Sequence, residues 1–266
     1  QLIDKWDHGA PTTRTNELKL EAGKTYALRV EFFQDGGDYV ARLAWKAGGK
    51  PTYADSIEAA KTADVAIVCV STMGTEGEGN DRPSMDLPND QAALIRAVAA
   101  ANRHTIVVLN NGTPVTMNDW LKSVPGVIEA WFPGQEGGAA LADILFGNVN
   151  PSGKLPDTLA VKRSDYPDLP NFPGANHEET YAEDIYVGYR HFDKANVEPL
   201  FPFGYGLSYT TFKYSNLSLS SAALQPDGSI AVRVEVTNTG KRAGEEIAQL
   251  YVHDLTRKRE FIAHPR

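Results

Sequence analysis

The segment TEGEGNDR, residues 75–82, combines residue types that can carry out acid–base chemistry. Glu76 and Glu78 each lie beside a glycine, and Asp81 and Arg82 follow directly. A carboxyl group on a flexible turn can reach a bound substrate and transfer a proton. The segment has neither a G-x-G-x-x-G pattern nor a Walker lysine, and its glutamates would repel phosphate, so we do not expect a nucleotide site. An exposed loop carboxylate without a chemical role explains the same residues.

The loop follows directly on an apolar run, DVAIVCV, which predicts a buried strand over residues 65–70. Helices and further apolar strands alternate around this strand. Helices are predicted at 55–62, 89–102 and 134–147, and strands at 105–115 and 126–132. Gly147 is expected to end the last helix. This alternation indicates a mostly parallel sheet covered on both faces. Ligands of such sheets bind outside the carboxyl ends of the strands, where the acidic loop lies.

The two ends of the chain follow a different pattern. Residues 17–46 alternate apolar and polar side chains with period two, which predicts antiparallel strands of a β-sandwich. From residue 209 onward, short strand patterns separated by Asx and Gly turns, the last over 245–254, indicate an immunoglobulin-like sandwich without its final strands. Both termini look like cuts through larger units. The sequence therefore predicts a multidomain protein of α/β and all-β parts.

Composition excludes several classes of function. The 266 residues carry a net charge of −8, and without a basic cluster we expect no nucleic-acid partner. No apolar run reaches the roughly 18 residues of a membrane span, so none is expected. The single cysteine, Cys69, allows no internal disulfide and is expected in the core. The six histidines are not spaced like metal ligands, so we expect no metal and no cofactor. The sequence leaves the compartment of the protein open: it can be periplasmic, secreted or cytoplasmic.

Several motifs together resemble glycoside hydrolase family 3, the β-glucosidase family, in order and spacing over roughly residues 55–255. They are EGNDRPSMDLP, NNGTPV, WFPGQEGGAALADILFGNVNPSGKLPDTL, EDIYVGYRHFD and FPFGYGLSYTTF. The resemblance implies four parts: the tail of a protective-antigen-type β-sandwich insert (1–48), an α/β sandwich domain with the acid/base loop (49–165), an aromatic-rich connector (166–206) and an incomplete fibronectin type III-like domain (207–266).

The resemblance also implies a reaction. In this family an N-terminal (α/β)8 barrel, absent from this chain, supplies an aspartate nucleophile, and the α/β sandwich domain supplies the acid/base glutamate. Glu78, the glutamate before G-x-D-R, matches that position, and Glu76 is its rival. Asp81 and Arg82 are expected to support the loop. The implied activity is retaining hydrolysis of terminal β-D-glucosyl residues of β-glucosides or cello-oligosaccharides, for which two carboxyl groups stand roughly 5–5.5 Å apart.

Alternatives stay open at this point. The chain can belong to a β-xylosidase or another exo-glycosidase of the family, or serve as a non-catalytic carbohydrate-binding or dimerisation fragment, and a homodimer is left open. Trp131 and Tyr186 are candidate sugar contacts, although packing is the preferred explanation for both. Glu136, at the start of a predicted helix, is expected to cap it. Because the barrel is missing, the chain alone is expected to be inactive.

Overall fold

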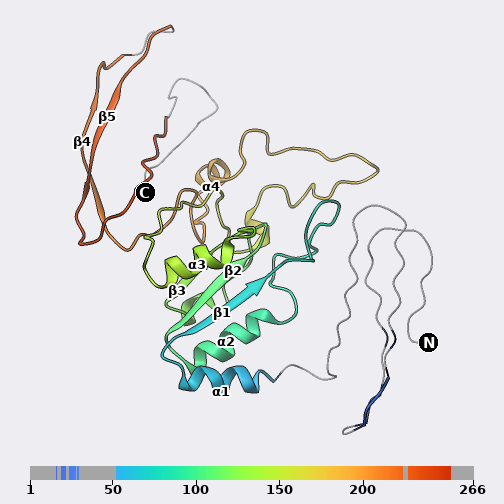
Figure 1. Cartoon of the computed structure of the whole chain (residues 1–266). Coiled ribbons are helices and arrows are strands. Elements are labelled where there is room, and N and C mark those ends of the chain that lie inside the picture. The colour runs from blue at the N-terminus through green and yellow to red at the C-terminus, as the bar shows by residue number, and fades with distance from the viewer. Residues whose placement is uncertain are drawn as a thin grey trace. The chain divides into compact units, whose positions relative to one another are not determined.

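The computed structural model describes residues 16, 19–21, 24–27, 29, 52–223 and 227–252 of the chain (Figure 1). The chain divides into two compact units, Gln1–Thr52 and Tyr53–Arg266, and every element below belongs to the second. The strands predicted within residues 17–46 lie largely outside the described residues. The β-sandwich tail therefore stays a prediction.

The second unit begins with a small α/β fold. Its elements are α1 (Ala54–Thr62), β1 (Ala66–Ser71), α2 (Gln91–Ala101), β2 (Thr105–Asn110), β3 (Gly126–Glu129) and α3 (Gly137–Leu145), with a 3-10 turn at Leu121–Ser123. The three strands are parallel in the order β1-β2-β3 (Figure 1). All three predicted helices and all three predicted strands are present, and the parallel sheet is confirmed. The strand β3 ends earlier than predicted, at Glu129.

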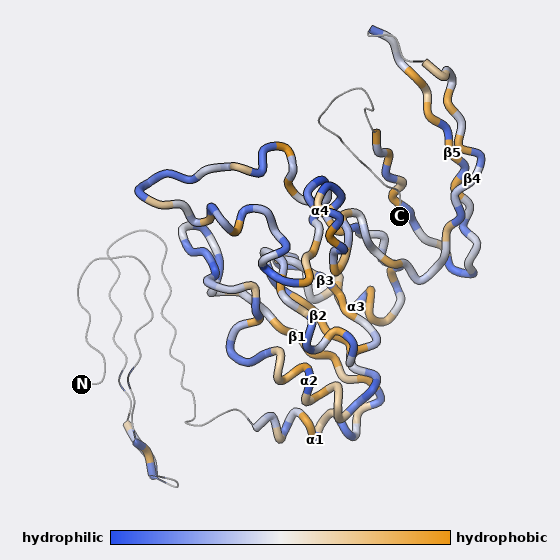
Figure 2. The backbone as a smooth tube through the Cα atoms, turned by 180° about the vertical axis from the view of Figure 1, so that it is seen from behind, coloured by the Kyte–Doolittle hydropathy of each residue, from blue (hydrophilic) through white to orange (hydrophobic). Residues whose placement is uncertain are grey.

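Apolar side chains of α2 and of the two longer strands form the core. Ile95 and Val98 of α2 are buried, and α2 packs against β1 and β2. Val68 and Val70 of β1 belong to the same cluster, and Figure 2 shows the apolar residues along the strands and on α2. This packing fixes the direction in which β1 delivers the acidic loop.

The prediction that Cys69 lies in the core is wrong. Cys69 is exposed, and the neighbouring Ile67 on the same face of β1 is 47% exposed. Because side chains alternate along a strand, Ala66, Val68 and Val70 face the buried cluster, and Ile67 and Cys69 face away from it. In β2, the central strand, residues of both faces are buried. Among the described residues, coverage of both sheet faces therefore holds for the central strand and not for the edge strand β1.

The expected capping of α3 by Glu136 is not observed, and α2 also begins without a side-chain cap. Asp90 and Glu136 occupy the N-cap positions of α2 and α3, but neither side chain makes a capping hydrogen bond. Asp90 has a left-handed backbone, with φ of 57°, which differs from the extended geometry that a capping side chain prefers. Gly147, with φ of 76°, follows α3 as predicted.

The connector contains more structure than its sequence predicts. A 3-10 turn at Arg163–Asp165 lies directly before the connector, and within the connector the helix α4 spans Tyr189–Ala195, with Phe192 buried. Leu159 and Phe201 form an isolated antiparallel bridge, in which the Leu159 amide donates to the Phe201 carbonyl at 2.8 Å. The connector is thus tied back to the core, because Leu159 is itself a buried member of it.

A two-stranded antiparallel sheet ends the described chain. It consists of β4 (Phe212–Leu219) and β5 (Val232–Asn238), with an irregularity between Ser215 and Ser218. The third strand predicted at 245–254 is not a strand within its described part, residues 245–252. Within the described residues this part of the chain forms one strand pair, and the fibronectin type III-like sandwich stays a prediction. None of the described helices is long and apolar enough to cross a membrane.

Candidate functional site

The loop after β1 ends in a tight turn that carries Glu78 at its tip. Gly77 and Asn80 exchange two backbone hydrogen bonds, at 3.1 and 3.0 Å, which leaves Glu78 and Gly79 as the two central residues. Gly79 has φ of 68°, the left-handed geometry that the second central residue of a type II turn requires. Glu78 is exposed. The turn therefore presents its carboxyl group to solvent.

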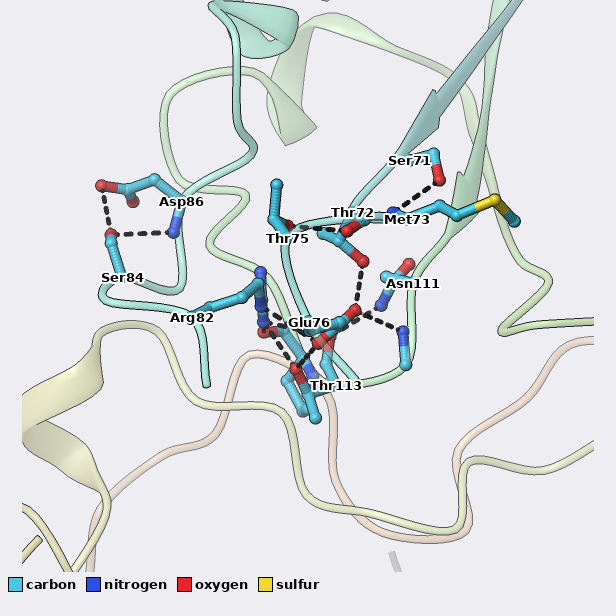
Figure 3. A network of polar contacts seen from close by, with 12 residues as sticks. Ser71, Thr72, Met73, Thr75, Glu76, Arg82, Ser84, Asp86, Asn111 and Thr113 are labelled. Atoms are coloured by element: carbon cyan, nitrogen blue, oxygen red, sulfur yellow. Dashed lines mark hydrogen bonds and ion pairs between the residues drawn. The ribbon is translucent and has the colours of Figure 1, made fainter. Parts of the chain in front are cut away.

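Glu76, at the base of this turn, is enclosed by hydrogen-bond donors (Figure 3). Its Oε1 accepts from the hydroxyl of Thr72 and from the backbone N–H of Gly112 at 2.7 Å. Its Oε2 accepts from the hydroxyl of Thr113 at 2.5 Å and lies 3.1 Å from Nε of Arg82. The side chains of Glu76 and Arg82 are only 9% and 7% exposed. Both carboxylate oxygens are thus occupied.

These partners keep Glu76 ionised. Burial by itself raises the pKa of Glu76, but the hydrogen bonds from Thr113, Thr72 and Gly112, together with the positive charge of Arg82, outweigh it and lower the pKa below its usual value. Donors aimed at both oxygens favour the charged form because a protonated oxygen would meet a donor with a proton of its own. Glu76 is therefore a buried anion.

Arg82 joins the loop after β1 to the loop after β2. Its Nη2 donates to the Thr113 hydroxyl at 2.7 Å and to the Pro114 carbonyl at 2.8 Å. With the Glu76 ion pair, these contacts close the base of the 77–80 turn, and we call Glu76, Arg82 and Thr113 the latch (Figure 3). Asp81, the other expected support residue, is exposed beside it. The latch therefore holds the base of the turn, while Glu78 at its tip stays exposed to solvent.

The segment that follows the latch is held in a similar way. Asp86 accepts hydrogen bonds from the hydroxyls of Ser84, at 2.9 Å, and Thr116. The bonds from Thr116 and Ser84 hold the pKa of Asp86 below its usual value. The Thr116 amide also donates to the Met85 carbonyl at 3.0 Å. Residues 84–86 are thereby tied to the chain beyond β2.

Sequence reasoning missed Glu129, a half-buried carboxyl group at the carboxyl end of β3. Burial raises the pKa of Glu129 to about 7, against the lowering effect of two donors. The Trp131 amide lies 3.2 Å from Oε1, and Nδ2 of Asn111 lies 3.5 Å from Oε2. A charged residue at the end of an otherwise apolar strand was the available signal. Its environment depends on the side chain of Asn111, which follows β2 and is not revealed by the local pattern around Glu129.

The two candidate sugar contacts differ in position. Trp131 follows β3 at the same sheet edge, is half-buried, and has φ of 51°, a left-handed backbone that is uncommon for a bulky residue. Its carbonyl accepts from Nδ2 of Asn110 at 2.8 Å. Tyr186 belongs to the connector, where Nζ of Lys194 lies 3.3 Å from its ring centroid. One ring face of Tyr186 is therefore already in contact with a cation.

No group of three or more metal-binding side chains occurs among the residues that the structure describes. The Glu76 carboxylate is satisfied by hydroxyl, amide and guanidinium donors, which are the partners of a structural network. The arrangement at the sheet edge can thus hold one free carboxyl group on an anchored turn.

Comparison with known proteins identifies the family. Residues 8–209 match the family described as Glycosyl hydrolase family 3 C-terminal domain. The chain belongs to this family. Thermostable beta-glucosidase B of Acetivibrio thermocellus is 49% identical over 199 residues, which are 74% of this chain and 26% of that protein. A beta-glucosidase of Rhizobium radiobacter is 45% identical over 268 residues, which are 94% of this chain and 32% of that protein. This family 3 chain thus spans about a quarter to a third of these curated relatives.

Solved structures give the same family. The GH3 beta-glucosidase of Bifidobacterium adolescentis matches 75% of this chain and 29% of its own, with a TM-score of 0.68 at 38% identity. A beta-glucosidase of Streptomyces venezuelae, solved in complex with D-glucose, matches 73% of this chain and 24% of its own, with a TM-score of 0.67 at 46% identity. The family 3 chain therefore shares both sequence and fold with β-glucosidases.

Proposed function

We propose that this chain is the part of a family 3 β-glucosidase that supplies the acid/base glutamate, and that Glu78 is this glutamate. The observation that carries the proposal is the position of Glu78 at the tip of a two-residue turn, with a buried ion pair between Glu76 and Arg82 at its base. A proton-transfer group must be accessible and yet held in place. An exposed tip on an anchored base satisfies both needs.

The reaction is retaining hydrolysis of a terminal, non-reducing β-D-glucosyl residue. Two carboxyl groups act in turn, roughly 5–5.5 Å apart. The nucleophile is an aspartate of an N-terminal (α/β)8 barrel outside this chain, and it forms the glucosyl-enzyme. Glu78 protonates the leaving oxygen in the first step and removes a proton from water in the second. β-Glucosides, including cello-oligosaccharides, are the substrate class, and no cofactor takes part.

Glu76 does not suit this role. A general acid must carry a proton and reach the leaving oxygen, whereas both oxygens of Glu76 accept from Thr72, Gly112 and Thr113. Its lowered pKa also keeps it deprotonated. We assign Glu76 and Arg82 to loop support, and Trp131, at the same sheet edge, to the surroundings of the sugar. The remaining parts, a protective-antigen-type insert tail and a fibronectin type III-like domain, complete the proposed organisation.

The experiment replaces Glu78 by glutamine in the full-length enzyme that contains this chain. Glu78→Gln keeps the shape and removes the acid, so cleavage of cellobiose, whose leaving group needs a proton, should slow by about 10²–10⁴-fold. With a dinitrophenyl glucoside the first step should be nearly unchanged, and hydrolysis of the glucosyl-enzyme should become slow. Azide needs no base, so it should accelerate turnover and yield glucosyl azide.

Glu76→Gln is the matched control, because it makes the same chemical change two residues earlier. It should lower activity by weakening the support of the loop, without azide rescue, because the acid/base group itself is still present. An equal loss on both substrates for Glu78→Gln, with no effect of azide, would contradict the assignment. The rescue pattern in Glu76→Gln would instead move the acid/base role to Glu76.

A further inference from the structure

A chain of polar groups, buried at Asn111 and exposed at Thr113, connects Glu129, at the end of β3, with the latch. Oε2 of Glu129 lies 3.5 Å from Nδ2 of Asn111, which also donates to the carbonyl of Thr113 at 2.9 Å. Thr113 in turn donates to Glu76 and accepts from Arg82. Asn111 itself is fully buried. A change at Glu129 can therefore reach the base of the turn through one amide and one backbone carbonyl.

We propose that Glu129 is a positioning residue for the acid/base loop: its neutral form keeps the Asn111 amide turned toward Thr113, and its ionised form draws this amide away. The inference rests on the proposed role of Glu78. Glu129 does not touch the substrate in this proposal; it acts through Asn111, Thr113 and the latch.

The two polar atoms of the Asn111 side chain explain how the protonation state of Glu129 can affect the loop. Nδ2 donates to the Thr113 carbonyl, whereas Oδ1 is buried without a hydrogen-bond partner among the described residues. A protonated Glu129 is a donor and can supply the bond that Oδ1 lacks, which leaves Nδ2 on Thr113. An ionised Glu129 is only an acceptor, and charge makes it a stronger one, so it attracts the second N–H of Nδ2, which lies 3.5 Å away, and pulls the amide away from the Thr113 carbonyl.

The surroundings allow Glu129 to change its charge in the neutral range. Burial raises the pKa of Glu129 to about 7, opposed by the Trp131 amide and by Asn111. The two groups within hydrogen-bond distance of Glu129, the Asn111 side chain after β2 and the Trp131 backbone amide after β3, are neutral amides. The charged groups of the network, Glu76 and Arg82, lie beyond Asn111 and Thr113. As the pH rises through about 7, Glu129 ionises. The bond from Asn111 to Thr113 should then weaken, and the latch should hold the 77–80 turn less firmly.

The test compares wild type with Glu129→Gln in the full-length enzyme by measuring kcat/KM against pH on two substrates. Glutamine copies the neutral acid and cannot ionise. With cellobiose, which needs the acid, the ratio of variant to wild type should be near one well below pH 7 and rise several-fold above it. With a dinitrophenyl glucoside, whose first step needs little protonation, the ratio should stay near one throughout. Glu58→Gln, an exposed carboxyl of α1, is the matched control and should behave as wild type.

Three outcomes overturn the proposal. The first is a ratio of kcat/KM that does not change with pH when cellobiose is the substrate. The second is the same pH-dependent change of this ratio on both substrates. The third is an equal loss of kcat/KM on both substrates at all pH values, which would indicate a general folding role. A second measurement uses wild type alone: the backbone amide shifts of Trp131, Gly112 and Thr113 should titrate together near pH 7, and shifts that do not titrate would also overturn it. If Glu78→Gln shows no azide rescue while the Glu129 ratio still changes with pH, the acid/base assignment has failed and the coupling of Glu129 to the loop has not.

Discussion

Replacing Glu76 by glutamine should destabilise the protein more than any ordinary surface substitution. Glu76→Gln keeps the side-chain shape but removes the charge and turns one acceptor into a donor. The three hydrogen bonds from Thr72, Gly112 and Thr113 then compete for a single oxygen. Arg82, at 7% exposure, loses its counterion in a place that water hardly reaches.

The magnitude follows from this burial. Removing one partner of a buried ion pair costs about 3–5 kcal/mol because the other charge stays buried and unpaired. The hydrogen bonds belong to the same network, so their energies are not added separately. We expect a loss of about 3–5 kcal/mol, which lowers the melting temperature by roughly 10 °C in a domain of this size. Glu58→Gln, which breaks the exposed pair of Glu58 and Lys61, should cost only about 0–0.5 kcal/mol.

Chemical denaturation of wild type, Glu76→Gln, Arg82→Met and the double variant measures this coupling. The double variant should lose less than the sum of the single losses, because neither charge is then left alone. The sign of the pH dependence is also determined. The folded-state pKa of Glu76 lies below its ordinary value of 4.5, so its contribution is complete above 4.5 and disappears as the pH falls through the folded pKa. A loss below about 1 kcal/mol, or one that stays the same in acid, would refute the reasoning.

Two further predictions concern the whole chain and one glycine. The chain alone should not hydrolyse aryl β-glucosides, because the proposed nucleophile lies outside it; turnover that survives purification and disappears in Glu78→Gln would contradict this. Gly112→Ala should cost about 1–3 kcal/mol in denaturation experiments, because a Cβ there would lie 2.7 Å from Cε2 of Phe132 and 3.3 Å from Oε1 of Glu76. Wild-type stability in this variant would mean that the Phe132 ring moves away without cost.

The sequence alone determined the regular elements of the α/β part and the place of the acidic loop. Periodicity predicts α1, α2 and α3, and unbroken apolar runs predict β1 and β2, because both signals come from neighbouring residues. The same local signals did not predict the helix α4, and they placed Cys69 in the core. Whether an apolar strand is central or at the edge depends on its neighbours in the sheet, which no local pattern records.

The tertiary structure decided what the two glutamates of one loop can do. In the sequence, Glu76 and Glu78 are nearly equivalent, each beside a glycine. Only the packing of β1 beside β2 brings the amide of Gly112 and the hydroxyl of Thr113 onto Glu76, across 36 and 37 residues of chain. The same packing makes Glu129 a half-buried acid. The charge state of a carboxyl group depends on the donors and the solvent around it, and both are set by contacts between distant segments.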